Sequence, residues 1–315
     1  METVSVFFGD LEFTLNRVAF TLFGVPIYWY GVLIALGFVC ALVYGFMRAS
    51  HFGIETDPLI DVILVTALFS IVGARLYYVL NTLDKIWTLP EIIDIRDGGL
   101  GFYGALIATV IVGFVMCKIR KVDVLSAFDL AGISYLVAQS IGRWGNFVNQ
   151  EAFGTSTNLP FGMFSAETHA YMSDYAAAHP ELNIDPYSPV HPCFLYESIW
   201  CMIGFVLIHF LSKKRVFRGE VFLYYITWYG LGRFFIEGLR TDSLMLFDTN
   251  IRISQLVAAV CVFVGIVLII VFRKRAKNRP VVQLVAAGEQ ASDDGYTSMI
   301  IDDDAPEAWA DDQND

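Results

Sequence analysis

The chain has 315 residues, of which 56% are hydrophobic and only 17% are charged, and its mean hydropathy is +0.56. This composition excludes an ordinary soluble domain, which carries more charge and interrupts its apolar runs every few residues. The net charge of −11 belongs almost entirely to a tail, because ten Asp and Glu residues and no Lys or Arg follow Arg279. We therefore predict no nucleic-acid partner.

Seven apolar segments along the chain are long enough to cross a bilayer, which requires about 20 residues of helix. In chain order they cover about residues 28–47, 58–80, 99–117, 123–142, 194–212, 220–236 and 253–272. Asp129 interrupts the fourth segment and Arg233 the sixth. The pattern predicts an all-α polytopic membrane protein with seven transmembrane helices.

The distribution of basic residues predicts the orientation of these helices. Thirteen of the 21 Lys and Arg residues lie in the connections after the first, third, fifth and seventh segments. The positive-inside rule then places the N-terminus outside and the C-terminus in the cytoplasm. The longest connection, about 143–193, contains five prolines and is predicted to form a small external cap between helices four and five. We predict that residues 1–279 form the membrane domain and that residues 280–315 form an acidic, disordered cytoplasmic tail.

The first candidate site lies at the outer end of the fourth segment, in residues 142–154. Arg143, Asn146 and Glu151 occur there between glycines, although a charged group costs about 2.5–3.5 kcal/mol to insert at membrane depth. A guanidinium beside an amide suits a phosphate or carboxylate ligand. The alternative is an Arg143–Glu151 pair that only caps the helix, and this segment alone does not decide between them.

A second polar run lies at the outer end of the sixth segment. Its residues follow at i, i+4, i+8 and i+11, which is one stripe of a helix, and they are Tyr229, Arg233, Glu237 and Arg240. A structural Arg233–Glu237 pair is one interpretation. Two arginines at one membrane depth favour the other interpretation, a site for a lipid phosphate.

Weaker candidates lie at the same predicted level, namely Tyr30, Tyr103 and His191. The chain contains no H-E-x-x-H, no G-x-S-x-G and no aspartate cluster suited to Mg²⁺. We therefore predict no metal and no cofactor, which leaves a reaction stabilised by arginines.

Residues 142–154, Gly-Arg-Trp-Gly-Asn-Phe-Val-Asn-Gln-Glu-Ala-Phe-Gly, resemble the signature G-R-x-G-N-F-x-N-x-E-x-x-G of prolipoprotein diacylglyceryl transferases and match it at every fixed position. The resemblance extends over about residues 20–275 and leaves out the acidic tail. It implies a multi-pass enzyme of the bacterial cytoplasmic membrane. Such an enzyme moves the diacylglyceryl group of phosphatidylglycerol onto the lipobox cysteine of a secreted prolipoprotein and releases glycerol phosphate, the first step of lipoprotein maturation.

The resemblance also implies roles for the polar residues. Arg143 and Arg233 would stabilise the departing phosphate, and Glu151 and Glu237 would orient them. The residues expected to contact phosphatidylglycerol are Tyr30, Arg143, Asn146, Gly154, His191, Tyr229, Arg233 and Arg240.

One position departs from the family pattern. Many members have a His, often assigned as the base, where this chain has Tyr103. A phenol has an ordinary pKa of about 10 against about 8.5 for a thiol, so a tyrosine in this role would need activation. The alternative interpretation is that the arginines lower the pKa of the incoming thiol, and both interpretations stay open. The competing class is a membrane transporter of a small anion, which internal repeats and charges near the midplane would favour.

Overall fold

The computed structural model describes residues 3–82, 87–94, 98–241, 243, 245–246 and 252–277. The chain divides into two compact units. Unit 1 comprises residues 1–4 and 15–149, and unit 2 comprises residues 5–14 and 150–315. The predicted tail, residues 280–315, lies outside the described residues.

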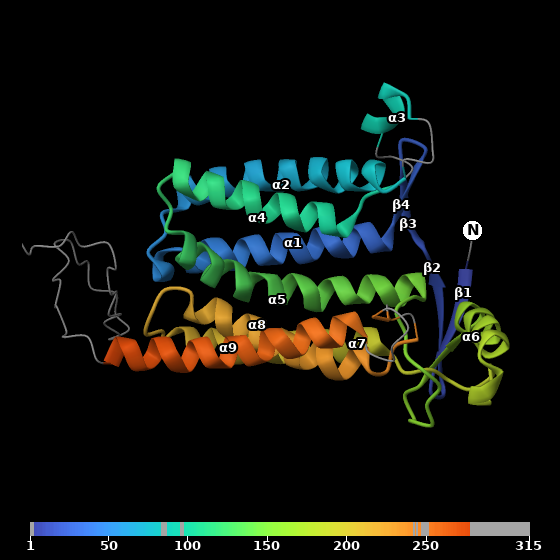
Figure 1. Cartoon of the computed structure of the whole chain (residues 1–315). Coiled ribbons are helices and arrows are strands. Elements are labelled where there is room, and N and C mark those ends of the chain that lie inside the picture. Colours follow the sequence, from blue (N-terminus) through green and yellow to red (C-terminus); the bar gives the residue numbers. More distant parts are fainter. Residues whose placement is uncertain are drawn as a thin grey trace, which may run out of the picture. The chain divides into compact units, whose positions relative to one another are not determined.

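Unit 1 is built from two pairs of packed helices (Figure 1). The helix α1 (Trp29–Arg48) packs on α5 (Val124–Asn149), and α2 (Thr56–Leu80) packs on α4 (Phe102–Ile119). Glycines allow this close approach, because a Cβ on Gly73 would lie 2.7 Å from the backbone oxygen of Gly104. The smaller elements of this unit are the hairpin β3 (Val18–Leu22) and β4 (Val25–Tyr28), η1 (Ser50–Phe52) and α3 (Leu89–Ile93).

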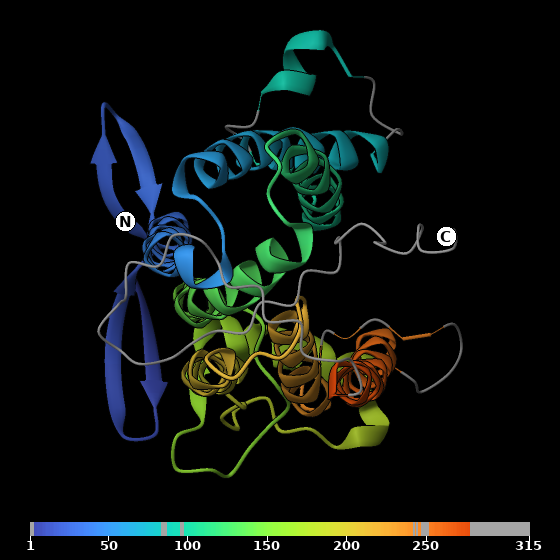
Figure 2. The ribbon, with the colours of Figure 1, turned by 90° about the vertical axis from the view of Figure 1, so that its left-hand side faces the viewer.

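Unit 2 contains three long helices, α7 (Cys193–Ser212), α8 (Glu220–Glu237) and α9 (Ile253–Lys277). Seen end-on in Figure 2, α8 lies between the other two and packs against both. The rings of Trp200 and Trp228 stack with centroids 4.3 Å apart, and each indole N–H donates a 2.9 Å hydrogen bond to the other residue's backbone carbonyl. Gly204 and Gly232 make room for these rings, since an added Cβ on either would lie 2.3 Å from an indole atom.

The connection between α5 and α7 carries more structure than its prolines suggested. A three-stranded sheet has the order β2–β1–β5, with β1 (Thr3–Phe8), β2 (Leu11–Asn16) and β5 (Met163–Ser165). Val6 pairs with Ser165 in the antiparallel β1–β5 ladder. Ser165 also caps α6 (Ala166–Ala178), because its hydroxyl accepts a hydrogen bond from the Thr168 amide. The short helix η2 (Pro180–Leu182) follows.

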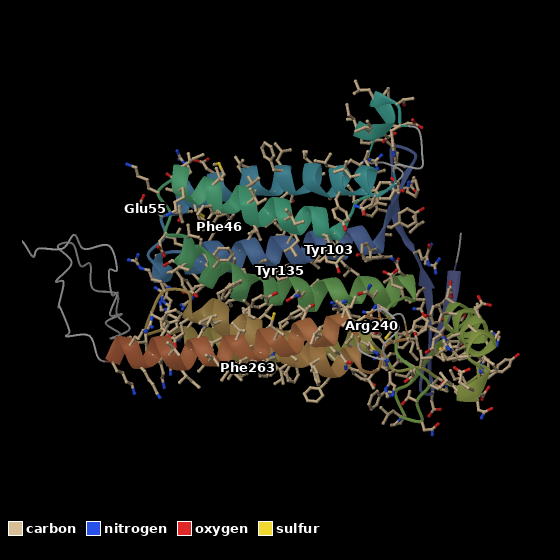
Figure 3. The ribbon with its side chains drawn as sticks, viewed as in Figure 1. Phe46, Glu55, Tyr103, Tyr135, Arg240 and Phe263 are labelled. Carbon is tan, nitrogen blue, oxygen red and sulfur yellow. The ribbon has the colours of Figure 1, made fainter. Side chains whose placement is uncertain are left out.

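Each of the seven predicted segments is a helix that begins within a few residues of the expected start, but α5 continues to Asn149 and α9 to Lys277, beyond the predicted ends at about 142 and 272. Among the described residues, six helices are long and apolar enough to cross a membrane: α1, α2, α4, α5, α7 and α9. The chain is thus a multi-pass membrane protein. Apolar side chains point outward from these helices, as Phe263 does from α9 (Figure 3), where lipid would cover them. The helix α8 is not among the six, and its 18 residues include three charged ones, Glu220, Arg233 and Glu237.

Candidate functional site

A buried cluster of charges surrounds Arg233 in unit 2. Its Nη1 donates a 2.9 Å hydrogen bond to Glu197 Oε1, and its Nη2 lies 2.5 Å from Glu237 Oε2. Arg233 and Glu237 are one turn apart on α8, whereas Glu197 comes from α7. Both carboxylates are buried, with 4% and 2% of their surface exposed. A single guanidinium therefore joins two helices through two buried ion pairs.

Residues at the start of α9 and just before it also form hydrogen bonds with Glu237. Ser254 Oγ donates a 2.9 Å hydrogen bond to Glu237 Oε1, and the Arg252 guanidinium donates to the Glu237 backbone carbonyl. A buried carboxylate is tolerated only when it is paired and hydrogen-bonded, which these contacts achieve. They also leave the carboxylate little freedom to move.

A further arginine approaches this cluster. Arg240 Nη1 lies 3.9 Å from Glu197 Oε1, so Arg233, Arg240 and Arg252 all approach the two glutamates, Glu197 and Glu237. Arginine is permanently charged, so each of these guanidiniums brings a positive charge to the cluster. Figure 3 places Arg240 just beyond α8.

Gly154 lies where two other segments of unit 2 meet. Its amide donates a 2.9 Å hydrogen bond to the His191 carbonyl, and it forms a β-bridge with Arg240. A Cβ at this position would lie 2.8 Å from both His191 Cβ and the Leu239 carbonyl oxygen. Only glycine permits this close approach. The last residue of the signature thus brings His191 and Arg240 together.

His191 precedes α7 and pairs with a residue in its first turn. Its Nδ1 lies 3.1 Å from the Tyr196 hydroxyl oxygen. Partial burial lowers the pKa of His191, because desolvation disfavours the imidazolium ion. The neutral ring is therefore the dominant form at neutral pH.

In unit 1 the signature begins on the last turns of α5. The helix persists to Asn149, so Arg143 and Asn146, which are three residues apart, share a face. Between them, Gly145 packs against Tyr30 of α1, and an added Cβ would lie 2.7 Å from the tyrosine ring. Arg17 Nη2 donates a 3.3 Å hydrogen bond to the Asn149 carbonyl at the helix end. Three of the predicted lipid contacts thus lie at one end of unit 1.

The signature continues into unit 2 with an unusual backbone. Gln150 and Ala152 both have φ of 58°, in the left-handed region that non-glycine residues seldom adopt. Gln150 is buried, and Glu151 between them is exposed. Such strain persists only where surrounding structure enforces it, and it is concentrated at functional sites.

Tyr103 is the second residue of α4 (Figure 3) and is 58% exposed. Its ring centroid lies 6.2 Å from that of Tyr77. The segment before α4 is organised by Arg75, whose guanidinium donates hydrogen bonds of 2.6 to 3.0 Å to the carbonyls of Glu91, Ile92, Gly98 and Gly99. Arg75 therefore has a structural role in placing the start of α4.

The structure brings five predicted residues into contact networks within unit 2: Gly154, His191, Arg233, Glu237 and Arg240. Tyr229 lies one turn before Arg233 on α8, where its ring stacks on Tyr225 at 6.0 Å. Sequence reasoning missed Arg252 and Ser254 and gave Glu197 no role as a partner of Arg233. The sequence does mark Glu197, because it is a charged residue that follows Tyr196 at the start of the fifth apolar segment.

The helices and polar contacts define the class, a multi-pass membrane protein with a buried ion-pair cluster around Arg233. The family model for prolipoprotein diacylglyceryl transferase matches residues 17–271. A protein of Clostridium novyi named phosphatidylglycerol–prolipoprotein diacylglyceryl transferase is 40% identical over 266 residues, which cover 84% of this chain and 98% of that protein. An Enterococcus faecalis protein of the same name is 41% identical over 268 residues, which cover 84% of this chain and 92% of that protein. The chain belongs to the prolipoprotein diacylglyceryl transferase family.

Proposed function

We propose that this membrane enzyme transfers the diacylglyceryl group of phosphatidylglycerol to the lipobox cysteine of prolipoproteins, the first step of bacterial lipoprotein maturation. The observation that carries the proposal is the family match over residues 17–271, which includes the whole signature and the Arg233 cluster. Residues 1–279 act as one enzyme domain, and the bacterial origin of the relatives supports a place in the cytoplasmic membrane.

The reaction forms one bond and breaks one. The thiolate sulfur attacks the glycerol carbon of the diacylglyceryl group, and the bond from that carbon to the phosphate oxygen breaks. Glycerol phosphate departs with the electron pair, while the thiol proton passes to a base. Because negative charge localises on the departing phosphate, preorganised cationic donors lower the barrier.

Arg233 is the first proposed donor. A guanidinium carries five N–H groups, more than its ion pairs with Glu197 and Glu237 require. The two carboxylates fix the plane of the guanidinium before the substrate arrives. The orienting role predicted for Glu237 is part of this proposal, which extends the same role to Glu197.

Arg143 is the second proposed donor, with Asn146 adding a hydrogen bond from the same face of α5. Glu151 is proposed to orient Arg143. Further contacts to phosphatidylglycerol are proposed for Tyr30, Gly154, His191, Tyr229 and Arg240. Two assignments are proposed for thiol activation, Tyr103 as the base or the field of the arginines acting on the thiol itself.

We also propose that α8 is the seventh span. Its charged residues are ion-paired within unit 2, Glu220 with Arg273 and Arg233 with Glu237, which offsets the cost of placing them in a membrane. The N-terminus then lies outside, the segment between α5 and α7 forms the external cap, and the tail is cytoplasmic. Reporter fusions after residues 50, 120, 215 and 280 should all report the cytoplasm, and an external result at two of them would overturn this topology.

A transfer assay tests the proposed function. Purified enzyme with phosphatidylglycerol and a lipobox peptide should form a thioether-linked diacylglyceryl peptide, detected by mass spectrometry, in the presence of EDTA. A matched peptide with Ser in place of the lipobox Cys is the control and should stay unmodified. Anion flux through proteoliposomes without any transfer would instead support the transporter hypothesis.

A further inference from the structure

The β3–β4 hairpin of unit 1 is as apolar as the membrane helix that follows it. Residues 18–47 contain no Asp, Glu, Lys, Arg or His. Within the hairpin, large apolar side chains are exposed instead of packed, among them Phe20, Leu22, Phe23 and Val25. Scattered exposed apolar residues are normal, but a continuous apolar element indicates a contact surface.

The base of the hairpin is fixed at the start of a membrane span. The strand β4 ends at Tyr28 and α1 begins at Trp29, whose amide donates a 3.0 Å hydrogen bond to the Arg17 carbonyl. The Arg17 side chain in turn bonds to the end of α5, at Asn149. In Figure 1 the hairpin runs across the end of α1 and does not continue along its axis, and Figure 2 shows it standing clear of the helices of unit 1. The hairpin therefore extends sideways from the end of this candidate membrane span.

The turn at the tip of the hairpin contains an aromatic residue in a backbone conformation that is unfavourable for bulky residues. Leu22 pairs with Val25, so Phe23 and Gly24 form a two-residue turn, with φ of 50° and 82°. Turns with two positive φ values prefer Asn or Asp followed by Gly, because a bulky residue is strained there. Phe23 is nonetheless present and is 97% exposed. A strained aromatic residue at an exposed tip indicates that its side chain has a partner outside the chain.

Two physical limits identify that partner. A two-stranded hairpin with apolar side chains on its surface is marginally stable in water. It cannot enter the hydrocarbon core either, because the outer backbone groups of both strands would lose their hydrogen-bonding partners. The interface between headgroups and acyl chains meets both conditions, since it supplies water to the backbone and lipid to the side chains.

We propose that residues 18–28 form an interfacial membrane anchor, with Phe23 inserted among the lipids of the leaflet at the start of α1. The anchor holds the base of α1 at a fixed depth and thereby positions the end of unit 1 that carries Tyr30, Arg143 and Asn146. This role is independent of which group the enzyme transfers.

Spin labelling of the full chain in phosphatidylglycerol-containing nanodiscs tests the proposal. A nitroxide is attached at Leu22→Cys, which leaves Phe23 in place, and its collisions with oxygen and with a water-soluble nickel chelate are compared. Labels at Tyr187→Cys, exposed in unit 2 outside the long helices, and at Phe263→Cys, midway along α9, are the aqueous and lipid references. Unsubstituted protein, labelled in parallel, gives the background from the five native cysteines.

The label at residue 22 should collide with the chelate several-fold less often than the label at residue 187. Phe23→Asn, which suits the turn better but removes the aromatic ring, should restore chelate access at residue 22, whereas Phe23→Trp should preserve protection. Circular dichroism and gel filtration check that each variant is folded. Equal chelate access at residues 22 and 187, or protection that survives Phe23→Asn, would overturn the proposal.

Discussion

Replacing Arg233 by Lys distinguishes between two roles of this residue, hydrogen-bond donor to the departing phosphate and purely structural ion-pair partner. Arginine reaches Glu197 through one nitrogen and Glu237 through another, and a single ammonium cannot reproduce both contacts. Glu237 keeps Ser254 and Glu197 keeps the more distant Arg240, so we expect the free energy of unfolding to fall by about 1–3 kcal/mol. If Arg233 also stabilises the departing phosphate, kcat should fall by about 10²–10³, equivalent to about 2.7–4 kcal/mol.

The same helices provide a matched control. Arg273 of α9 pairs with Glu220, which is fully buried, and with the Tyr224 hydroxyl, toward the opposite end of α8. Arg273→Lys should lower stability to a similar extent and leave kcat of the folded protein within a few-fold of the parent. Both variants are purified in detergent, their folded fractions are measured by thermal unfolding, and transfer rates are expressed per folded enzyme.

The comparison has a clear refuting result. If Arg233→Lys shows the parent kcat per folded enzyme and only a lower melting temperature, Arg233 is a brace like Arg273. A large loss of kcat in both variants would show that the assay follows stability and not chemistry.

The other predictions concern single positions and the tail. Tyr103→Phe should be nearly inactive if Tyr103 is the base, and Tyr103→His should stay active; a fully active Tyr103→Phe at neutral pH would assign thiol activation to the arginines. Gly154→Ala should cost about 1–3 kcal/mol and reduce transfer, because its methyl group would collide with His191, and an unchanged melting temperature would contradict this. Burial lowers the pKa of His191, so just below pH 6.5 the unfolded state binds more protons than the folded state, and the free energy of unfolding should fall as the pH is lowered through that range. His191→Gln should flatten this pH dependence, measured by thermal unfolding. Deleting residues 281–315 should leave transfer activity within a few-fold, and its loss in a normally inserted truncation would reveal a role for the tail.

The long helices were predictable because a bilayer demands apolar runs of a minimum length. The end of α5 could not be predicted in this way, because the apolar run stops near residue 142 while the helix continues to Asn149. Backbone hydrogen bonds propagate a helix through polar residues as readily as through apolar ones. The strands before residue 29 and the helix α6 were missed, because short elements with weak amphipathic patterns leave no span-length signal.

Contacts within the site were predictable only between residues that share one helix. The i, i+4 spacing indicated the Arg233–Glu237 pair, and the structure confirms their contact. Glu197 and Ser254 reach the same cluster from α7 and α9, and spacing within one segment carries no information about contacts between helices. Likewise the need for glycine at position 154 becomes clear only when His191 and the Leu239 carbonyl lie beside it.

The proposed reaction exchanges a lipid phosphate ester for a thioether. Phosphorus-31 NMR of the enzyme with phosphatidylglycerol and a lipobox peptide measures this directly, together with mass spectrometry of the peptide. The proposed reaction requires that one glycerol phosphate is released for each thioether formed, and that none is released when the peptide carries Ser in place of Cys. Glycerol phosphate released without the Cys peptide, or a modified peptide without glycerol phosphate, would contradict it.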